Sequence, residues 1–155
     1  MSVLSDEAVT MFRSGFNCAQ SVLACAGRGS GMSLDMAVRL GEAFGGGMCH
    51  HDQTCGAVTG GLMAIGLKCS RGESRDPAMR QKASQVAAEF MARFEALRGA
   101  VSCTGVLGVD LSRPGGVEEF RQRDLSATVC ARAVKDAVEI LEELLGASPA
   151  GAAEA

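Results

Sequence analysis

The sequence contains no tryptophan and no tyrosine, and proline occurs only 3 times in 155 residues. Runs that alternate apolar and polar residues are also scarce, so the usual signals for β-strands are missing. Apolar residues instead recur every three or four positions, which is the period of an amphipathic helix. We therefore expect an all-α protein, a compact bundle of about six or seven helices in one domain spanning residues 1–146. Residues 147–155 are small or polar, which predicts a flexible C-terminal tail.

Two further features are missing, and their absence bears on nucleic-acid binding and on membrane insertion. The net charge is −3, and no Lys/Arg-rich block or interleaved aromatic stripe is present, so we expect no nucleic-acid binding. The longest apolar stretch, residues 57–67, is interrupted by Thr59 and glycines and is too short to span a bilayer. We therefore expect no membrane span.

The first residues, MSVLSDEAVTMFRSGF, lack a basic region followed by a long apolar stretch, so we expect no secretory leader. The chain nevertheless has 7 cysteines, an odd and large number for its length. Together these features predict a cytoplasmic protein. In a reducing compartment cysteines more often bind metals, catalyse reactions or pack in cores than form structural disulfides.

Short polar residues that can cap helix N-termini precede most of the helical segments. The predicted caps and helices are Ser5 for the first helix, Asn17 with Gln20 for residues 18–26, Ser33 for residues 34–44, Asp52 or Thr54 for residues 55–67, Asp76 with Pro77 for residues 78–97, Ser102 for a short turn, a polar helix at residues 117–123, and a last helix at residues 126–145. In the third helix, Met36 and Leu40 are expected on the apolar stripe.

Four cysteines fall at predicted helix starts or on inner helix faces: Cys18, Cys55, Cys103 and Cys130. A thiol in a first helical turn faces unpaired N–H groups and the positive end of the helix dipole, and both favour the thiolate. Cys55 and Cys18 satisfy this condition, and Cys55 is the favoured nucleophile. The long spacings between these cysteines mean that the fold must bring them together.

The cysteine segments resemble those of the C_GCAxxG_C_C family, a group of small proteins with four characteristic cysteines. The resemblance covers about residues 7–146. It is carried by FNCAQ at residues 16–20, the glycine-rich FGGGM at residues 44–48, CGAVTG at residues 55–60, and the segments that follow Cys103 and Cys130. It implies an α-helical fold and a redox role. Part of the family signature also resembles split-Soret cytochromes, but no Cys-x-x-Cys-His sequence occurs, so covalent c-type haem is not expected.

These residues support a thiol-based redox hypothesis. Cys18, Cys55, Cys103 and Cys130 would carry out thiol–disulfide or electron-transfer chemistry, as in a thiol oxidoreductase, with a redox protein or a small thiol as the partner.

A second hypothesis is a metal- or iron–sulfur-binding helical module without turnover. Its ligands would be the same four sulfurs together with Cys49 and His50, and its cofactor zinc or an iron–sulfur cluster. His50 is also a candidate proton acceptor for Cys55. His51 is expected to be an incidental loop residue.

A third hypothesis is a helical interaction protein, a homodimer formed through the small residues Gly56, Gly60 and Ala64. In that case the cysteines would simply pack in the core. Cys25 and Cys69 are assigned to packing or to chance.

Overall fold

The computed structural model describes residues 2–72 and 75–146, and these are almost entirely helical. The predicted all-α class is confirmed, and within the described ranges the β-structure amounts to an isolated antiparallel bridge between Thr54 and Ser102. The predicted tail, residues 147–155, lies outside the described residues. The elements are α1 (Val3–Arg13), α2 (Cys18–Ala26), α3 (Leu34–Gly41), the 3₁₀ turn η1 (Glu42–Phe44), α4 (Gly45–His50), α5 (Gly56–Cys69), α6 (Pro77–Arg98), α7 (Cys103–Leu107), α8 (Gly116–Gln122), the π-helical turn η2 (Ser126–Cys130) and α9 (Ala131–Leu145).

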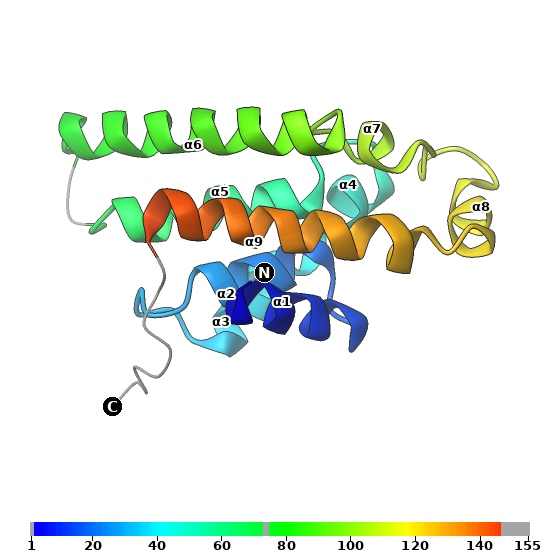
Figure 1. The fold of residues 1–155 in the computed structure, drawn as a ribbon, viewed down its shortest axis with the longest axis horizontal. Helices are drawn as coiled ribbons and strands as arrows, with labels where there is room; N and C mark the ends of the chain where they lie inside the picture. The colour runs from blue at the N-terminus through cyan, green and yellow to red at the C-terminus, as the bar shows by residue number, and fades with distance from the viewer. Residues whose placement is uncertain (1, 73–74, 147–155) are drawn as a thin grey trace.

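The long helices stack in layers (Figure 1). Helix α6 covers one side of α5 and α9, while α1, α2 and α3 lie on the opposite side. The short elements α4, α7 and α8 gather at one end of the bundle, where α5 and α9 begin. No helix in the described ranges is long and apolar enough to cross a membrane.

The core lies between α2, α5, α6 and α9. Phe90 and Phe94 of α6 are completely buried, with ring centroids 6.3 Å apart. Glycines let the helices approach closely, because a Cβ atom at Gly60 would lie 2.6 Å from the carbonyl oxygen of Ala19 on α2. A Cβ atom at Gly61 would lie 2.4 Å from the ring of Phe90. These contacts leave no room for larger side chains at Gly60 and Gly61.

The internal packing of α5 corrects one expectation. Gly56, Gly60 and Ala64 are all buried, and the first two face α2 within the same chain. The predicted homodimer through this face is therefore wrong, because the small residues serve the contact between two helices of one molecule.

Most predicted caps are confirmed. Asn17 and Gln20 form a capping box at α2, and Ser33, Asp76 and Ser102 cap α3, α6 and α7.

Two caps are corrected. The cap of α1 is Ser2, with Ser5 as its capping-box partner rather than the cap itself. Helix α5 has Cys55 in the cap position without a side-chain cap. Asp52 instead accepts a hydrogen bond from the Thr104 N–H of α7, at 3.2 Å. Backbone pairing between the segments before α5 and α7 places Asp52 over α7.

The third helix also differs from the prediction. Helix α3 ends at Gly41, and Met36 and Leu40 are exposed, with 43% and 51% of their surface accessible. Ala37 and Gly41 are buried instead, and a Cβ atom at Gly41 would lie 2.8 Å from the side chain of Gln20. Close approach to α2 requires the small residues of α3, so its large apolar residues point outward.

Candidate functional site

The four predicted site cysteines stand at the starts of elements. Cys18 is the first residue of α2, Cys55 is the cap residue of α5, Cys103 is the first residue of α7, and Cys130 ends the π-helical turn before α9. Cys18, Cys55 and Cys103 are buried, whereas Cys130 is partly exposed. π-Helical turns inside α-helices are rare and occur frequently at functional sites.

Backbone hydrogen bonds bring Cys55 and Cys103 together. The Cys55 N–H donates to the Val101 carbonyl at 2.8 Å, and the Cys103 N–H donates to the Gln53 carbonyl at 2.8 Å. The bridge between Thr54 and Ser102 lies between these two bonds. A short antiparallel pairing of two loops thus joins cysteines that are far apart in the sequence.

Glycines make room for the sulfur-bearing side chains. A Cβ atom at Gly47 would lie 2.5 Å from the Cβ of Cys103, and one at Gly56 would lie 3.0 Å from the Cβ of Cys18. Both glycines belong to the motifs on which the family resemblance depends. Their lack of a side chain is therefore a packing requirement of the cysteine cluster.

The electrostatics show that each of the four cysteines lies near the other three. Charge on Cys55, Cys103 or Cys130 would raise the pKa of Cys18, and charge on Cys130 would raise the pKa of Cys55. The pKa of Cys103 rises to about 12, first because of burial and then because of the neighbouring Cys55 and Cys130 and the carboxylate of Asp52. We call Cys18, Cys55, Cys103 and Cys130 together the cysteine cluster.

One hydrogen bond distinguishes two members of the cluster. The Cys18 thiol donates to the sulfur of Cys130. This bond, followed by burial, raises the pKa of Cys18 well above its ordinary value. It lowers the pKa of Cys130, against the opposing effect of burial. Cys130 is therefore the sulfur most easily ionised in this pair.

The predicted thiolate character of Cys55 and Cys18 is wrong. The N–H groups of Ala57 and Val58 do lower the pKa of Cys55, as its position at a helix start predicts. Burial has a larger and opposite effect, and the pKa of Cys55 rises to about 11. Desolvation of a charged sulfur thus outweighs the helix N-terminus at this site.

The loop before Cys55 has an unusual backbone. Gly46, Gly47, Met48, Cys49 and His50 all have positive φ angles, between 54° and 68°, which makes α4 a left-handed turn after its first residue. A non-glycine residue in this conformation costs about 1–2 kcal/mol. Strain of this kind persists where the surrounding structure enforces it, and it is concentrated at functional sites.

Local contacts hold this left-handed turn. The Gln53 N–H donates to the Gly47 carbonyl at 3.1 Å, and the exposed Cys49 thiol donates to the Ala43 carbonyl at 3.4 Å. The Nδ1 atom of His51 lies 3.0 Å from the Met48 carbonyl oxygen and 2.9 Å from that of Cys49, so it donates to them. His51 is therefore a loop-stabilising residue.

The predicted metal ligands do not form a ready-made metal site. Among the described residues, no three Cys, His, Asp or Glu side chains lie close enough to hold a metal ion together. This search includes all six candidate ligands, Cys18, Cys49, His50, Cys55, Cys103 and Cys130. The arrangement thus gives the metal hypothesis no support, and zinc or an iron–sulfur cluster remains a prediction.

A cavity of about 280 Å³ adjoins the cluster. Cys103, Cys130 and His50 line it, whereas Cys18 and Cys55 do not. His50 thus shares a cavity with two cluster sulfurs rather than with Cys55, the partner predicted for it. The remaining lining residues are Phe12, Gly46, Leu107, Leu111, Val117, Phe120, Arg121 and Ser126.

Sequence reasoning missed most of this cavity lining. Phe12, Val117, Phe120 and Arg121 occupy ordinary positions of amphipathic helices, and no local motif marks them. They come from α1 and α8, which the tertiary fold brings together beside the start of α9. The local sequence therefore does not identify these residues as part of a cavity.

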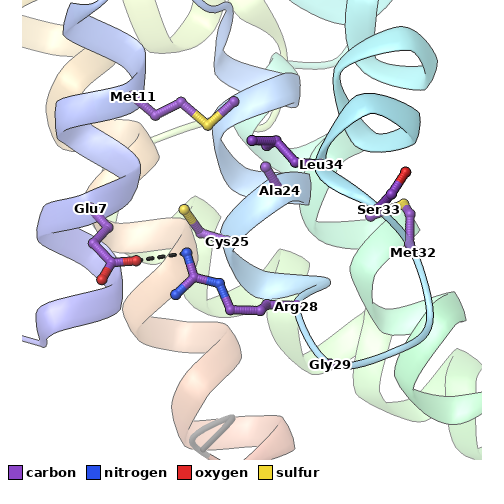
Figure 2. A pocket seen from close by; sticks show the side chains of 9 residues that line it. All are labelled: Glu7, Met11, Ala24, Cys25, Arg28, Gly29, Met32, Ser33 and Leu34. Atoms are coloured by element: carbon purple, nitrogen blue, oxygen red, sulfur yellow. Dashed lines mark ion pairs between the residues drawn. The ribbon is translucent and has the colours of Figure 1, made fainter. Parts of the chain in front are cut away.

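A second cavity, of about 390 Å³, lies between α1, α2 and α3. Figure 2 shows Cys25 and Arg28 beside Glu7, whose carboxylate pairs with the Arg28 guanidinium at 2.7 Å. Burial raises the pKa of Cys25 to about 11. Cys25 is 3% exposed and packs in the main core, whereas Cys69, at the end of α5, is partly buried against that core.

Comparison with protein families gives a match over most of the chain. The model of a family described as "Putative redox-active protein (C_GCAxxG_C_C)" matches residues 16–144. The matched region includes all four members of the cysteine cluster. No curated protein and no solved structure matches the chain.

Proposed function

The chain belongs to the C_GCAxxG_C_C family of redox-active proteins, and we propose that its reaction is thiol–disulfide exchange at the cysteine cluster. Cys130 is the attacking sulfur and Cys18 is the resolving sulfur. The observation that carries this proposal is the gathering of four cysteines from separate elements into one interacting group, in which Cys18 lowers the pKa of Cys130. A disulfide forms where the two Cβ atoms can come within about 3.5–4.5 Å of each other.

The reaction has two steps. The Cys130 thiolate attacks one sulfur of a partner disulfide, forms a mixed disulfide and releases the other partner sulfur as a thiolate, which takes up a proton. Cys18 then loses its proton, attacks the Cys130 sulfur and releases the first partner sulfur. Overall the partner disulfide gains two electrons and two protons, and the Cys18–Cys130 dithiol becomes a disulfide.

Three properties favour Cys130 over Cys55 as the attacking sulfur. Cys130 is partly exposed, it lines a cavity, and it accepts a hydrogen bond that stabilises its thiolate. Cys55 is 5% exposed, and burial raises its pKa to about 11. In this mechanism Cys55 and Cys103 form the surroundings of the reacting pair and restrict the access of water to it.

A redox titration of the folded, metal-free protein tests the proposal. Free thiols are counted by mass spectrometry after equilibration across about −320 to −120 mV, the range in which cellular dithiols operate. We expect the loss of two thiols in one two-electron transition. Cys18→Ser and Cys130→Ser remove the transition, whereas Cys25→Ser and Cys69→Ser retain it.

Two results would overturn the proposal. The first is that all four cluster cysteines stay reduced and unreactive across this range while the protein is folded. The second is stoichiometric zinc or an iron–sulfur absorption spectrum in protein purified without oxygen, which would assign the same sulfurs to a metal-binding module.

A further inference from the structure

The cavity beside Cys103 and Cys130 has the composition of a binding site for a small ligand. Its walls are mainly apolar and come from different parts of the chain: Phe12 from α1, Leu107 from α7, and Val117 and Phe120 from α8. The main core and a smaller core around Leu107 and Leu111 pack separately, and Cys130 contacts both. A volume of about 280 Å³ is at the lower end for small-molecule sites.

Few polar groups interrupt these apolar walls, and they differ in chemistry. Arg121 is the one permanently charged group on the lining, and its side chain is 72% exposed. Its ion pair with Glu118 is long, at 4.0 Å, and both partners are exposed, so Arg121 is only weakly engaged. Two sulfurs, Cys103 and Cys130, form the reactive part of the lining.

We propose that this cavity binds a small disulfide on a short aliphatic chain that ends in a carboxylate. The aliphatic chain lies against Phe12, Val117 and Phe120, the carboxylate pairs with Arg121, and the disulfide meets Cys130. This inference rests on the proposed thiol–disulfide exchange and specifies its substrate class.

The position of Cys18 suits exchange with such a ligand. Cys130 lines the cavity and Cys18 does not, although the two sulfurs are hydrogen-bonded. The ligand therefore contacts Cys130 and not Cys18. After Cys130 attacks a cyclic disulfide, one ligand sulfur is bound to Cys130 and the other leaves as a thiolate and is protonated. Cys18 then loses its proton and attacks the sulfur of Cys130, and the ligand sulfur bound there leaves as a thiolate and is protonated. The ligand thus departs as a dithiol and the protein keeps the disulfide.

Lipoate is a suitable probe, because it is a cyclic disulfide on a short alkyl chain with a carboxylate. Its binding is measured by calorimetry with full-length Cys130→Ser protein, in which exchange through Cys130 cannot occur. We expect lipoate to bind and glutathione disulfide, which is larger and more polar, to bind at least about tenfold more weakly.

Matched variants test the two parts of the site. In the Cys130→Ser protein, the additional substitution Arg121→Gln should weaken lipoate binding roughly five- to tenfold. It should leave the binding of uncharged lipoamide unchanged. Arg123→Gln is the control, because Arg123 is exposed on the same segment, pairs with Glu119 and does not line the cavity. Val117→Phe fills the cavity and should abolish binding of both probes, with circular dichroism confirming the fold.

The results separate the two proposals. Equal lipoate affinity with and without Arg121, or glutathione disulfide binding as tightly as lipoate, overturns the assigned ligand class. Absence of lipoate binding in a protein that still shows the two-electron transition also overturns it, while the redox function stands. If lipoate binds with the expected Arg121 dependence but reduced wild-type protein never exchanges with it, the binding site stands and the thiol–disulfide function fails.

Discussion

Two cavities of this protein each place a cysteine near an arginine, yet they differ in chemistry. The larger cavity, of about 390 Å³, contains Cys25 and Arg28, and the smaller one, of about 280 Å³, contains Cys130 and Arg121. In the larger cavity Arg28 pairs with Glu7 at 2.7 Å, and no second cysteine is among the lining residues (Figure 2). In the smaller one a second cysteine lines the wall, and Cys18 donates a hydrogen bond to Cys130.

The difference shows what a thiol needs in order to react. Cys25 has a cation nearby, but Glu7 opposes the effect of Arg28, and burial raises the pKa of Cys25 to about 11. The pKa of Cys130 is lowered against the opposing effect of partial burial, because the neighbouring Cys18 stabilises its thiolate. A directed hydrogen bond thus matters more than the size of the cavity or a nearby charge.

The largest expected difference between the two cavities is in alkylation rate. The pKa of Cys130 lies below its ordinary value of 9.0 and that of Cys25 is about 11, so their thiolate fractions at pH 7 differ by at least about 100-fold. The lower nucleophilicity of the more acidic thiol reduces this to at least about tenfold. We expect iodoacetamide to modify Cys130 faster than Cys25 by that factor, as measured by residue-resolved mass spectrometry.

A substitution identifies the cause of this reactivity. Cys18→Ala removes the hydrogen-bond donor and should slow the alkylation of Cys130, whereas Cys25→Ser should leave it unchanged. Unaltered reactivity of Cys130 in Cys18→Ala would show that the hydrogen bond is not the cause.

Glycine substitutions compare the packing near the two cavities. A Cβ atom at Gly47 would lie 2.5 Å from the Cβ of Cys103, whereas Gly31, in the loop beside the other cavity, faces open space. Both have positive φ angles, 68° and 79°, so each alanine costs about 1–2 kcal/mol in backbone strain. Crowding adds about 1–3 kcal/mol at Gly47 alone. Urea unfolding should therefore show a larger loss of stability for Gly47→Ala than for Gly31→Ala, and equal losses would contradict the tight packing around Cys103.

Alkaline pH distinguishes Cys25 from Cys130, because their contributions to the free energy of unfolding change with pH in opposite directions. The folded pKa of Cys25, about 11, exceeds its ordinary value of 9.0, so its contribution to stability is complete below pH 9 and is lost as the pH rises to 11. Two pKa units correspond to at most about 3 kcal/mol. In Cys25→Ala the fall in unfolding free energy between pH 9 and 11 should be smaller by about 2 kcal/mol.

Cys130 provides the opposite case. Its folded pKa is lowered, so its contribution to stability is present above the ordinary pKa and is lost as the pH falls through the folded value. The rate of alkylation of each thiol, measured against pH in the folded protein, should have its midpoint below 9.0 for Cys130 and at about 11 for Cys25. Midpoints shifted in the same direction would refute the opposite signs of the two shifts.

The smallest expected effect concerns the left-handed turn beside the cluster. Cys49 has a φ angle of 54° and is exposed, and the hydrogen bond described for its side chain joins the thiol to the carbonyl of Ala43. Glycine adopts this conformation without steric cost. Cys49→Gly should therefore stabilise the protein by about 1 kcal/mol in urea unfolding, without changing the two-electron transition. A loss of stability would show that the turn is not strained at this position.

Much of the fold could be predicted from the sequence because its signals are local. The helical period, the capping box of Asn17 and Gln20, and the pair Asp76–Pro77 predicted helices that the structure contains. The cap of α5 and the exposed face of α3 could not be predicted, because both depend on contacts between distant segments. Asp52 accepts a hydrogen bond from Thr104 of α7 since two loops pair, and Met36 and Leu40 are exposed since small residues of α3 face α2.

For the site, the sequence by itself determined that Cys18, Cys55 and Cys103 stand at the starts of elements and which glycines accompany them, whereas the position of Cys130 before α9 came from the structure. Only the tertiary structure decided which sulfur ionises most easily. A helix start favours the thiolate through nearby N–H groups, and this effect can be read locally at Cys55. Burial and the donor at Cys18 come from segments far along the chain, and they raise the pKa of Cys55 and lower that of Cys130. Desolvation and hydrogen bonding depend on neighbours in space, and the order of residues along a chain does not specify those neighbours.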